Sequence, residues 1–300
     1  MNLFILVIIV IVIIVIFCNK IRIEKYSNDS SQIDNIFKKY ITKSKDIVKI
    51  GKGSNSIVVY DINYPLYAFK IIKNKDLSKI NNNEIKAYQE ITEHLSKIKS
   101  LPNAKLIKFY GYQIYSHDNK NLLIIMLERV IFRDQRLTNI VNLTDNHYFK
   151  KYDNIDDEGK RINLNYLKKI IGKNLNDYMK QLGNLFAIIH YICHHNINDC
   201  EIYLGYKNNN YIFYIADLDQ SKYIKNYKDS YSILSMAKSI DDSLYFRKKS
   251  KLCFKSFSKG YLEISKIVKA DQYAQKVLKI LNTLIERNIE NHFEHHLLDT

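Results

Sequence analysis

The residues of this chain with the clearest potential for chemistry lie between Gln181 and Lys222. This stretch starts with an amphipathic helical pattern, passes through a polar loop, and continues as short apolar strands joined by a turn at Lys207 to Asn210. The loop and the residues after the last strand contain His194, His195, Asn196, Asp199, Glu201, Asp217, Leu218 and Asp219. Polar groups enclosed between apolar runs predict a functional site. The carboxylates of Glu201 and Asp217 are suitable ligands for Mg²⁺ or Mn²⁺, because hard cations prefer oxygen.

A second candidate binding region lies between Asp46 and Lys73. Apolar residues alternate on both sides of a glycine-containing turn, which predicts a hairpin, and a third β-rich run follows the break at Asn63 to Pro65. A helix is predicted over Asn81 to Lys97, where polar residues suited to an N-cap precede apolar residues at helical spacing. The residues that we expect to bind a ligand in this region are Gly51, Gly53, Ser56, Val58, Lys70 and Glu84.

Both regions resemble the nucleotide-binding motifs of protein kinases. Gly51 to Val58 is similar to the glycine-rich loop, whose small residues let backbone amides close over phosphates. Ala68 to Lys70 is similar to the strand that carries the phosphate-binding lysine. Glu84 corresponds to the acidic partner of that lysine, with an exposed surface carboxylate as the alternative interpretation. The resemblance implies ATP with Mg²⁺ or Mn²⁺ as the cofactor.

In the same resemblance, the polar loop corresponds to the kinase catalytic loop H-R-D-x-x-x-x-N, and Asp217 to Asp219 corresponds to D-F-G. Asn196 stands where kinases have the aspartate that accepts the substrate proton, and an amide has no useful basicity. Glu201 stands at the metal-binding asparagine, and Asp217 keeps its carboxylate. Asp199 is a candidate substitute base, although a structural role in bonding loop amides is the favoured interpretation.

A more specific resemblance covers Gln181 to Ile267. Here the chain is similar to fungal kinase-like proteins of unknown function that are sometimes found with zinc-finger segments. The similar motifs occur in order at Ile189-His190, Asn198 to Gly205, Asp217 to Asp219, Tyr245 to Arg247 and Phe257 to Leu262. No A-P-E motif follows Asp219, so we expect a reduced carboxyl-terminal lobe.

These patterns predict an α+β fold, a two-lobed protein-kinase-like domain. The amino-terminal lobe, residues 46–130, is expected to be a five-stranded antiparallel sheet with one helix, including strands over 105–115 and 122–127. The carboxyl-terminal lobe, residues 131–300, is expected to be reduced and mainly helical, with a polar, irregular insertion near 132–174. A terminal helix is predicted from Asp271 to about His292.

The amino-terminal 18 residues include an unbroken apolar run from Leu3 to Cys18, which predicts a transmembrane anchor over residues 1–19 that contacts membrane lipid. A cleaved signal peptide is less favoured, because no basic region precedes the run. A juxtamembrane tether is expected over residues 20–45, with one helix between Tyr26 and Lys45, where apolar residues recur intermittently. Its basic residues place the rest of the chain in the cytosol.

Composition sets the remaining limits on function. The apolar content of 46% is enough for a real core. The net charge of +15 suggests an anionic partner, either lipid or nucleic acid, although frequent Lys, Asn, Ile and Tyr are also typical of an AT-rich genome, including that of a large virus. His190, Cys193 and His194 lie close together in the sequence, but a zinc site needs four ligands. We therefore expect these histidines to be structural.

Three hypotheses about function follow. The first is a membrane-anchored pseudokinase-like protein that binds a nucleotide or a protein partner without phosphoryl transfer. The second is a divergent active phosphotransferase that uses Asp199 or Asp219 as its base. The third is a structural single-pass membrane protein whose basic surface binds an anionic partner.

Overall fold

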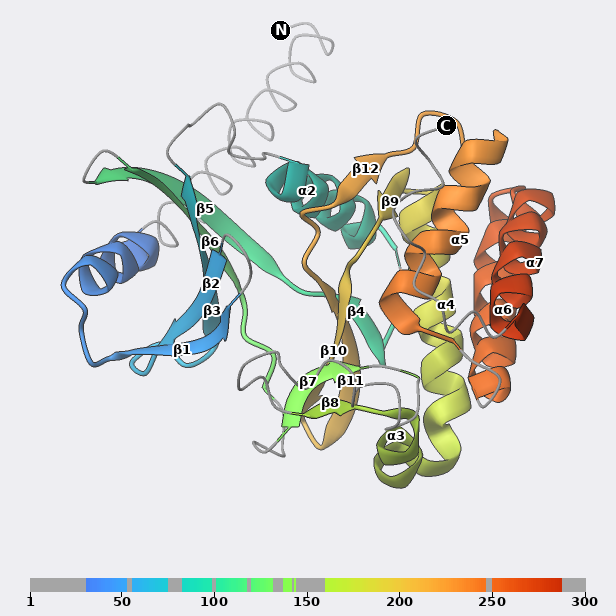
Figure 1. Cartoon of the computed structure of the whole chain (residues 1–300), viewed down its shortest axis with the longest axis horizontal. Coiled ribbons are helices and arrows are strands. Elements are labelled where there is room, and N and C mark those ends of the chain that lie inside the picture. Colours follow the sequence, from blue (N-terminus) through green and yellow to red (C-terminus); the bar gives the residue numbers. More distant parts are fainter. Residues whose placement is uncertain are drawn as a thin grey trace, which may run out of the picture. The chain divides into compact units, whose positions relative to one another are not determined.

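The computed structural model describes residues 31–52, 56–74, 83–98, 101–117, 120–131, 137–141, 143, 160–246 and 250–287 (Figure 1). The chain divides into a first unit, Met1–Ile80 with Lys108–Arg129, and a second unit, Asn81–Ile107 with Val130–Thr300. Each unit has its own sheet, and the described helices and strands together give an α+β fold. The α+β class agrees with the prediction.

The first unit is built on a five-stranded antiparallel sheet of order β1-β2-β3-β6-β5, which confirms the predicted sheet. Its strands are β1 (Ile47–Lys52), β2 (Ser56–Asp61), β3 (Tyr67–Asn74), β5 (Phe109–His117) and β6 (Lys120–Glu128). The continuous apolar run of β6 is buried on both faces of the sheet, as is usual for a central strand. The single strand predicted over 105–115 is wrong, because its first residues pair with a strand of the second unit.

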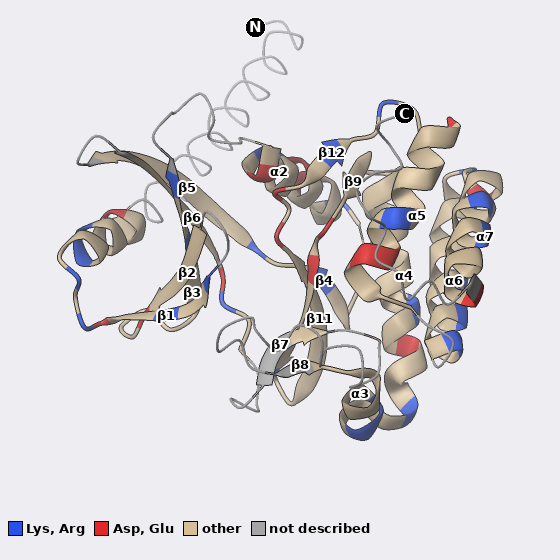
Figure 2. Cartoon of the chain, viewed as in Figure 1, with Lys and Arg blue, Asp and Glu red and all other residues tan. Residues whose placement is uncertain are grey.

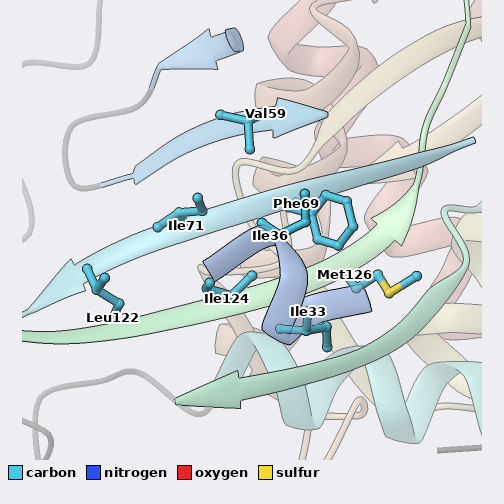
Figure 3. Close-up of a cluster of buried hydrophobic side chains, with 8 residues drawn as sticks. All are labelled: Ile33, Ile36, Val59, Phe69, Ile71, Leu122, Ile124 and Met126. Carbon is cyan, nitrogen blue, oxygen red and sulfur yellow. The ribbon is translucent and has the colours of Figure 1, made fainter. Parts of the chain in front are cut away.

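A helix over residues 31–41 covers one face of this sheet. Ile33 and Ile36 are buried in a cluster with side chains from the strands (Figure 3), namely Val59, Phe69, Ile71, Leu122, Ile124 and Met126. Phe37 stacks on Tyr115 with ring centroids 4.0 Å apart. Residues 31–41, which we expected within a juxtamembrane tether, therefore form part of the core of the first unit. The difference arises because the short apolar pattern of this segment does not show which surface covers it.

The second unit contains a mixed five-stranded sheet of order β4-β11-β10-β7-β8. Its strands are β4 (Ala104–Leu106), β7 (Leu137–Val141), β8 (Lys160–Ile162), β10 (Glu201–Lys207) and β11 (Asn210–Ala216). β10 and β11 form the predicted hairpin, and its turn residues Asn208 and Asn209 have φ angles of 51° and 62°. Positive φ at both positions is typical of a type I′ turn, which asparagine tolerates well.

Part of the region that we expected to be an irregular insertion is ordered. It contributes β7 and β8, followed by α3 (Leu164–Ile171) and the short 3₁₀ helix η3 (Gly172–Asn174). The side chain of Asn163 caps α3 by accepting a hydrogen bond from the Tyr166 amide at 2.9 Å. The expectation of irregular structure throughout 132–174 is wrong for these segments. Residues 132–136, 142 and 144–159 lie outside the described residues.

Most of the described residues of the second unit are helical. α2 (Asn83–Ser96) matches the helix predicted over 81–97, although it groups with the second unit and not with the first sheet. The others are α4 (Leu175–Tyr191), α5 (Ser230–Leu244), α6 (Lys251–Ile267) and α7 (Asp271–Arg287), where α6 packs against both α4 and α7 (Figure 1). The short strands β9 (His195–Ile197) and β12 (Ser221–Tyr223) pair with each other.

Close backbone contact joins α4 and α6. A Cβ atom added to Gly183 of α4 would lie 2.0 Å from the carbonyl oxygen of Phe257, and one added to Gly260 of α6 would lie 1.9 Å from that of Lys180. Only glycine fits at these two positions without moving a helix. The crossing therefore depends on two residues that appear unremarkable in the sequence.

Among the described residues, no helix has the length and apolar character needed to span a membrane. The apolar run from Leu3 to Cys18, on which the predicted anchor rests, lies outside the described residues. The carboxyl-terminal end of the predicted helix, beyond Arg287, also lies outside them.

We expect Gly183→Ala to destabilise the second unit by about 2–3 kcal/mol, because the new methyl group forces the α4 and α6 backbones apart. Gly51→Ala is the matched control, since its Cβ would lie 3.5 Å from the nearest atom, an ordinary contact with Val58. Urea unfolding followed by circular dichroism measures both variants. An unchanged unfolding midpoint for Gly183→Ala would contradict the close crossing.

Candidate functional site

One row of residues crosses all five strands of the first unit. Gly51 pairs with Val58, Val58 with Lys70, Lys70 with Ile125, and Ile125 with Tyr112. Directly opposed residues on antiparallel strands place their side chains on the same face of the sheet. The structure therefore brings three of the predicted ligand-binding residues, Gly51, Val58 and Lys70, into one row.

This row lies on the sheet face opposite the helix over residues 31–41. Phe69 and Ile71, the neighbours of Lys70 in β3, point into the cluster with that helix, so alternation places Lys70 on the other face. Lys70 is only 7% exposed and is flanked in the row by Val58 and Ile125. Because so little of Lys70 is exposed, water screens the charge of its ammonium less than it would at the surface.

The remaining predicted residues of this region are distributed differently. Ser56 begins β2, whereas Gly53 lies outside the described residues. Glu84 is on α2 in the second unit, and Lys70 is in the first. The ion pair expected between Glu84 and Lys70 stays a prediction.

In the second unit, the β10–β11 hairpin brings the two predicted metal ligands to one end. Glu201 pairs with Ala216, so Asp217, the next residue, lies beside Glu201. The hydroxyl of Tyr203 donates a hydrogen bond to the Glu201 carboxylate. Asp217 has a φ angle of 59°, a left-handed conformation that is uncommon outside glycine and often marks functional positions.

Tyr88 of α2 contacts the backbone of Asp217. Its hydroxyl oxygen accepts a hydrogen bond from the Asp217 backbone amide at 3.2 Å. Burial raises the pKa of Tyr88 well above its usual value, and the negative charges of Glu84 and Asp217 raise it further. The hydroxyl therefore stays protonated at physiological pH. In the sequence Tyr88 was visible only as part of an apolar stripe, and its position one turn after Glu84 was the available signal.

Asp199, Glu201 and Asp217 all act electrostatically on the buried thiol of Cys200. Burial raises the pKa of that thiol to about 12, with a smaller contribution from the three carboxylates. Among the described residues, however, no group of three or more His, Cys, Asp or Glu side chains is arranged to hold a metal ion. A metal bound by Glu201 and Asp217 would need further oxygen ligands, which is typical of Mg²⁺ held by one or two carboxylates and nucleotide phosphates.

Asn196, at the position expected for a catalytic base, is 3% exposed. Its side-chain amide donates hydrogen bonds to Asn198 Oδ1 at 2.9 Å and to Ser235 Oγ at 2.6 Å. Asn196 thus joins the loop to α5 and has no chemistry to offer as a base. Asp199 is exposed and has a φ angle of 53°.

His195 connects the loop to two other elements, a role that sequence analysis did not predict. Its Nε2 lies 2.7 Å from Glu90 Oε2 of α2, and its Nδ1 lies 3.1 Å from Ser221 Oγ of β12. Burial lowers the pKa of His195, while the hydrogen bond and charge of Glu90 oppose that effect. The ring holds α2, β9 and β12 together.

His190 is fully buried among aromatic rings of α4 and α6, in agreement with a structural role. Its Nδ1 lies 2.8 Å from the Tyr261 hydroxyl, which in turn donates to the Tyr191 hydroxyl at 3.2 Å. This arrangement makes Nδ1 the donor to Tyr261 and leaves Nε2 as a buried acceptor without a partner in the described part of the chain. Cys193, the third member of the suggested zinc group, has a pKa raised to about 12 by burial.

No family model and no curated protein matches the sequence. Among solved structures, this chain is similar to WaaP in complex with acyl carrier protein, at 12% sequence identity and a TM-score of 0.42. The match covers 80% of this chain and 87% of that chain. Similarity at this level supports no conclusion about activity. The resemblance to the fungal family accordingly stays a resemblance of motifs.

His190 should make the fold sensitive to acid. Burial lowers the pKa of His190 from 6.5 to about 3, so the unfolded chain binds a proton that the folded chain does not. Stability is therefore full above about pH 6.5 and falls as the pH drops toward 3, by roughly 3 kcal/mol at about pH 4.5. We expect His190→Phe, which keeps a ring and removes the unpaired acceptor, to lose this pH dependence.

Urea unfolding at neutral and acidic pH measures the effect. At neutral pH the variant should differ from the parent by no more than about 1 kcal/mol, since one hydrogen bond is lost and one unpaired acceptor is removed. A variant that loses as much stability in acid as the parent would show that another group carries the proton linkage.

Proposed function

We propose that this chain is a protein-kinase-like, nucleotide-binding protein that does not transfer the phosphoryl group. Lys70 contacts phosphate oxygens, and Asp217 and Glu201 contact the accompanying Mg²⁺ or Mn²⁺. The single observation that carries the proposal is the row from Gly51 to Tyr112, which sets Lys70 among apolar side chains on one sheet face.

The row has the two properties that a nucleotide requires. A nucleotide combines a flat apolar base with charged phosphates. Val58, which is partly exposed, supplies apolar surface beside Lys70, and Gly51 adds no side chain at the end of the row. The ammonium of Lys70 supplies the opposite charge for phosphate oxygens.

The carboxylate pair of the second unit supports the metal part of the proposal. Mg²⁺ bound with a nucleotide commonly takes one or two carboxylates from the protein and its other oxygens from phosphates and water. The hairpin register places Glu201 beside Asp217. Tyr203 donates a hydrogen bond to the Glu201 carboxylate, and the Tyr88 hydroxyl accepts one from the Asp217 backbone amide.

The absence of turnover follows from Asn196. A phosphotransferase of this type needs a group that accepts the proton of the attacking hydroxyl. The amide of Asn196 accepts no proton, and its hydrogens are bonded to Asn198 and Ser235. The proposed role is therefore that of a scaffold whose binding to a protein partner is regulated by the nucleotide.

We further propose that Leu3 to Cys18 anchors the chain in a membrane, with this domain on the cytosolic side. Resistance to alkaline extraction from membranes would test this proposal.

We expect ATP with Mg²⁺ to raise the melting temperature of the full chain. At a ligand concentration of about one hundred times the dissociation constant, the stabilisation is about 2.7 kcal/mol. Lys70→Ala should abolish the shift. Asp217→Asn should leave a smaller shift that no longer depends on Mg²⁺, because the metal contact is lost.

Lys73→Ala is the matched control for Lys70→Ala. Lys73 lies on the same strand but is exposed, and its ammonium lies 5.5 Å from the centre of the Tyr40 ring on the side of the helix over residues 31–41. This variant should keep the full ATP shift. If the parent shows no shift, or if both lysine variants lose it equally, the proposal is wrong.

A second candidate function is divergent phosphoryl transfer with Asp199 as the base. The observation in its favour is that Asp199 is exposed and lies in the short loop between β9 and β10, two residues before Glu201. If it is right, transfer of labelled γ-phosphate should fall by about 10²–10⁴-fold in Asp199→Asn, with ATP binding unchanged. Transfer by the parent that survives this substitution would exclude Asp199, and no transfer by the parent would favour the scaffold.

A further inference from the structure

An exposed basic and apolar surface follows the carboxylate pair in the second unit. We name it the β12–α5 surface, and it consists of Tyr223, Lys225, Lys228, Tyr231 and Leu234. The exposed fractions of the three apolar side chains are 59% for Tyr223, 75% for Tyr231 and 50% for Leu234. Both lysines are exposed. Figure 2 shows blue in the loop between β12 and α5.

The backbone beneath this surface is held firmly. Tyr227 stacks on His194 with centroids 6.0 Å apart and packs edge-on against Tyr191 and Tyr273. The backbone amide of the buried Ile224 donates to the His194 carbonyl at 2.7 Å. The exposed side chains are therefore presented by an ordered support.

Two of the apolar side chains share one face of α5. Asp229 caps the helix by accepting a hydrogen bond from the Ser232 amide at 2.7 Å. Tyr231 and Leu234 are three residues apart and so lie on the same side of the helix. The buried side of α5 is formed by other residues, including Ile233 and Met236. Tyr231 and Leu234 are therefore not part of the core of the second unit.

A surface that combines exposed lysines with exposed tyrosine and leucine side chains suits the interfacial region of an anionic bilayer. The ammonium groups meet lipid phosphates, while tyrosine and leucine enter the region between headgroups and acyl chains. We propose that the β12–α5 surface binds anionic lipid headgroups and holds this face of the second unit against a membrane. This goes beyond the proposed function and does not depend on nucleotide binding.

A bilayer fits these observations better than a nucleic acid. Bases stack on rings that lie along a surface, whereas Tyr231, at 75% exposure, projects from it. Leu234 offers no π-face to a base, but it contributes when it enters an apolar layer. The apolar run from Leu3 to Cys18 is a second feature of the same chain that suits a membrane.

A nitroxide label at Leu234→Cys tests the proposal in the full chain. Cys18 is first replaced by serine. Burial raises the pKa values of Cys193 and Cys200 to about 12 and that of Cys253 to about 11, so these thiols react slowly with the label. Vesicles are either pure phosphatidylcholine or a mixture with phosphatidylserine. With anionic vesicles, but not with neutral ones, the accessibility of the label to dissolved oxygen should rise severalfold relative to its accessibility to a water-soluble nickel complex.

Matched variants separate this surface from general attraction. A label at Leu252→Cys, on the 70%-exposed Leu252 of α6, should show no such change. Lys225→Glu with Lys228→Glu should abolish the change at position 234. Lys255→Glu with Lys259→Glu, two exposed lysines of α6, should not. High salt should weaken the change in the parent.

The proposal is overturned if the label at 234 responds equally to neutral vesicles, if the label at 252 responds equally, or if charge reversal has no effect. It is also overturned if a single-stranded oligonucleotide immobilises the label at 234 and anionic vesicles do not. Lys70→Ala should keep the lipid response, so a failure of nucleotide binding and a failure of lipid binding are distinguishable.

Discussion

The second unit depends on the backbone approach between α4 and α6. Gly183 and Gly260 allow the two helices to touch through their carbonyl groups, which leaves no room for a side chain at either position. The same two helices are also joined by a buried hydrogen bond between His190 and Tyr261. Because α4 ends at Tyr191, immediately before the polar loop, this crossing fixes where the loop begins. The position of every loop residue follows from that starting point.

Beyond that point, polar contacts tie the loop and the hairpin to different helices. His195 bonds to Glu90 of α2, and Asn196 bonds to Ser235 of α5. The hydroxyl of Tyr88 accepts a hydrogen bond from the backbone amide of Asp217, which follows β11. A buried polar group that is paired costs little, whereas breaking its contact leaves a costly unsatisfied group. These hydrogen bonds hold the loop in place, and they come from residue types that often take part in catalysis.

Local pattern predicted the local structure well. The hairpin around Asn208 and Asn209 and the β3 strand carrying Lys70 needed only short-range alternation and turn chemistry. Sequence analysis failed where pairing is distant. β4 pairs in parallel with β11, more than one hundred residues away, so the single strand predicted over 105–115 was wrong. The contact of His195 with Glu90, which are 105 residues apart, left no trace in any local pattern. The close approach of α4 and α6 at their glycines was also not predicted, because it joins residues far apart in the sequence.

The neutral residue at position 196 has an electrostatic consequence. Three carboxylates, those of Asp199, Glu201 and Asp217, already act on Cys200 at the base of the hairpin. An aspartate at position 196, buried to 3% exposure, would add a charge that burial and like-charged neighbours both disfavour. Asparagine keeps the hydrogen bonds to Asn198 and Ser235 without that charge. The loop thereby keeps these hydrogen bonds without a further buried charge.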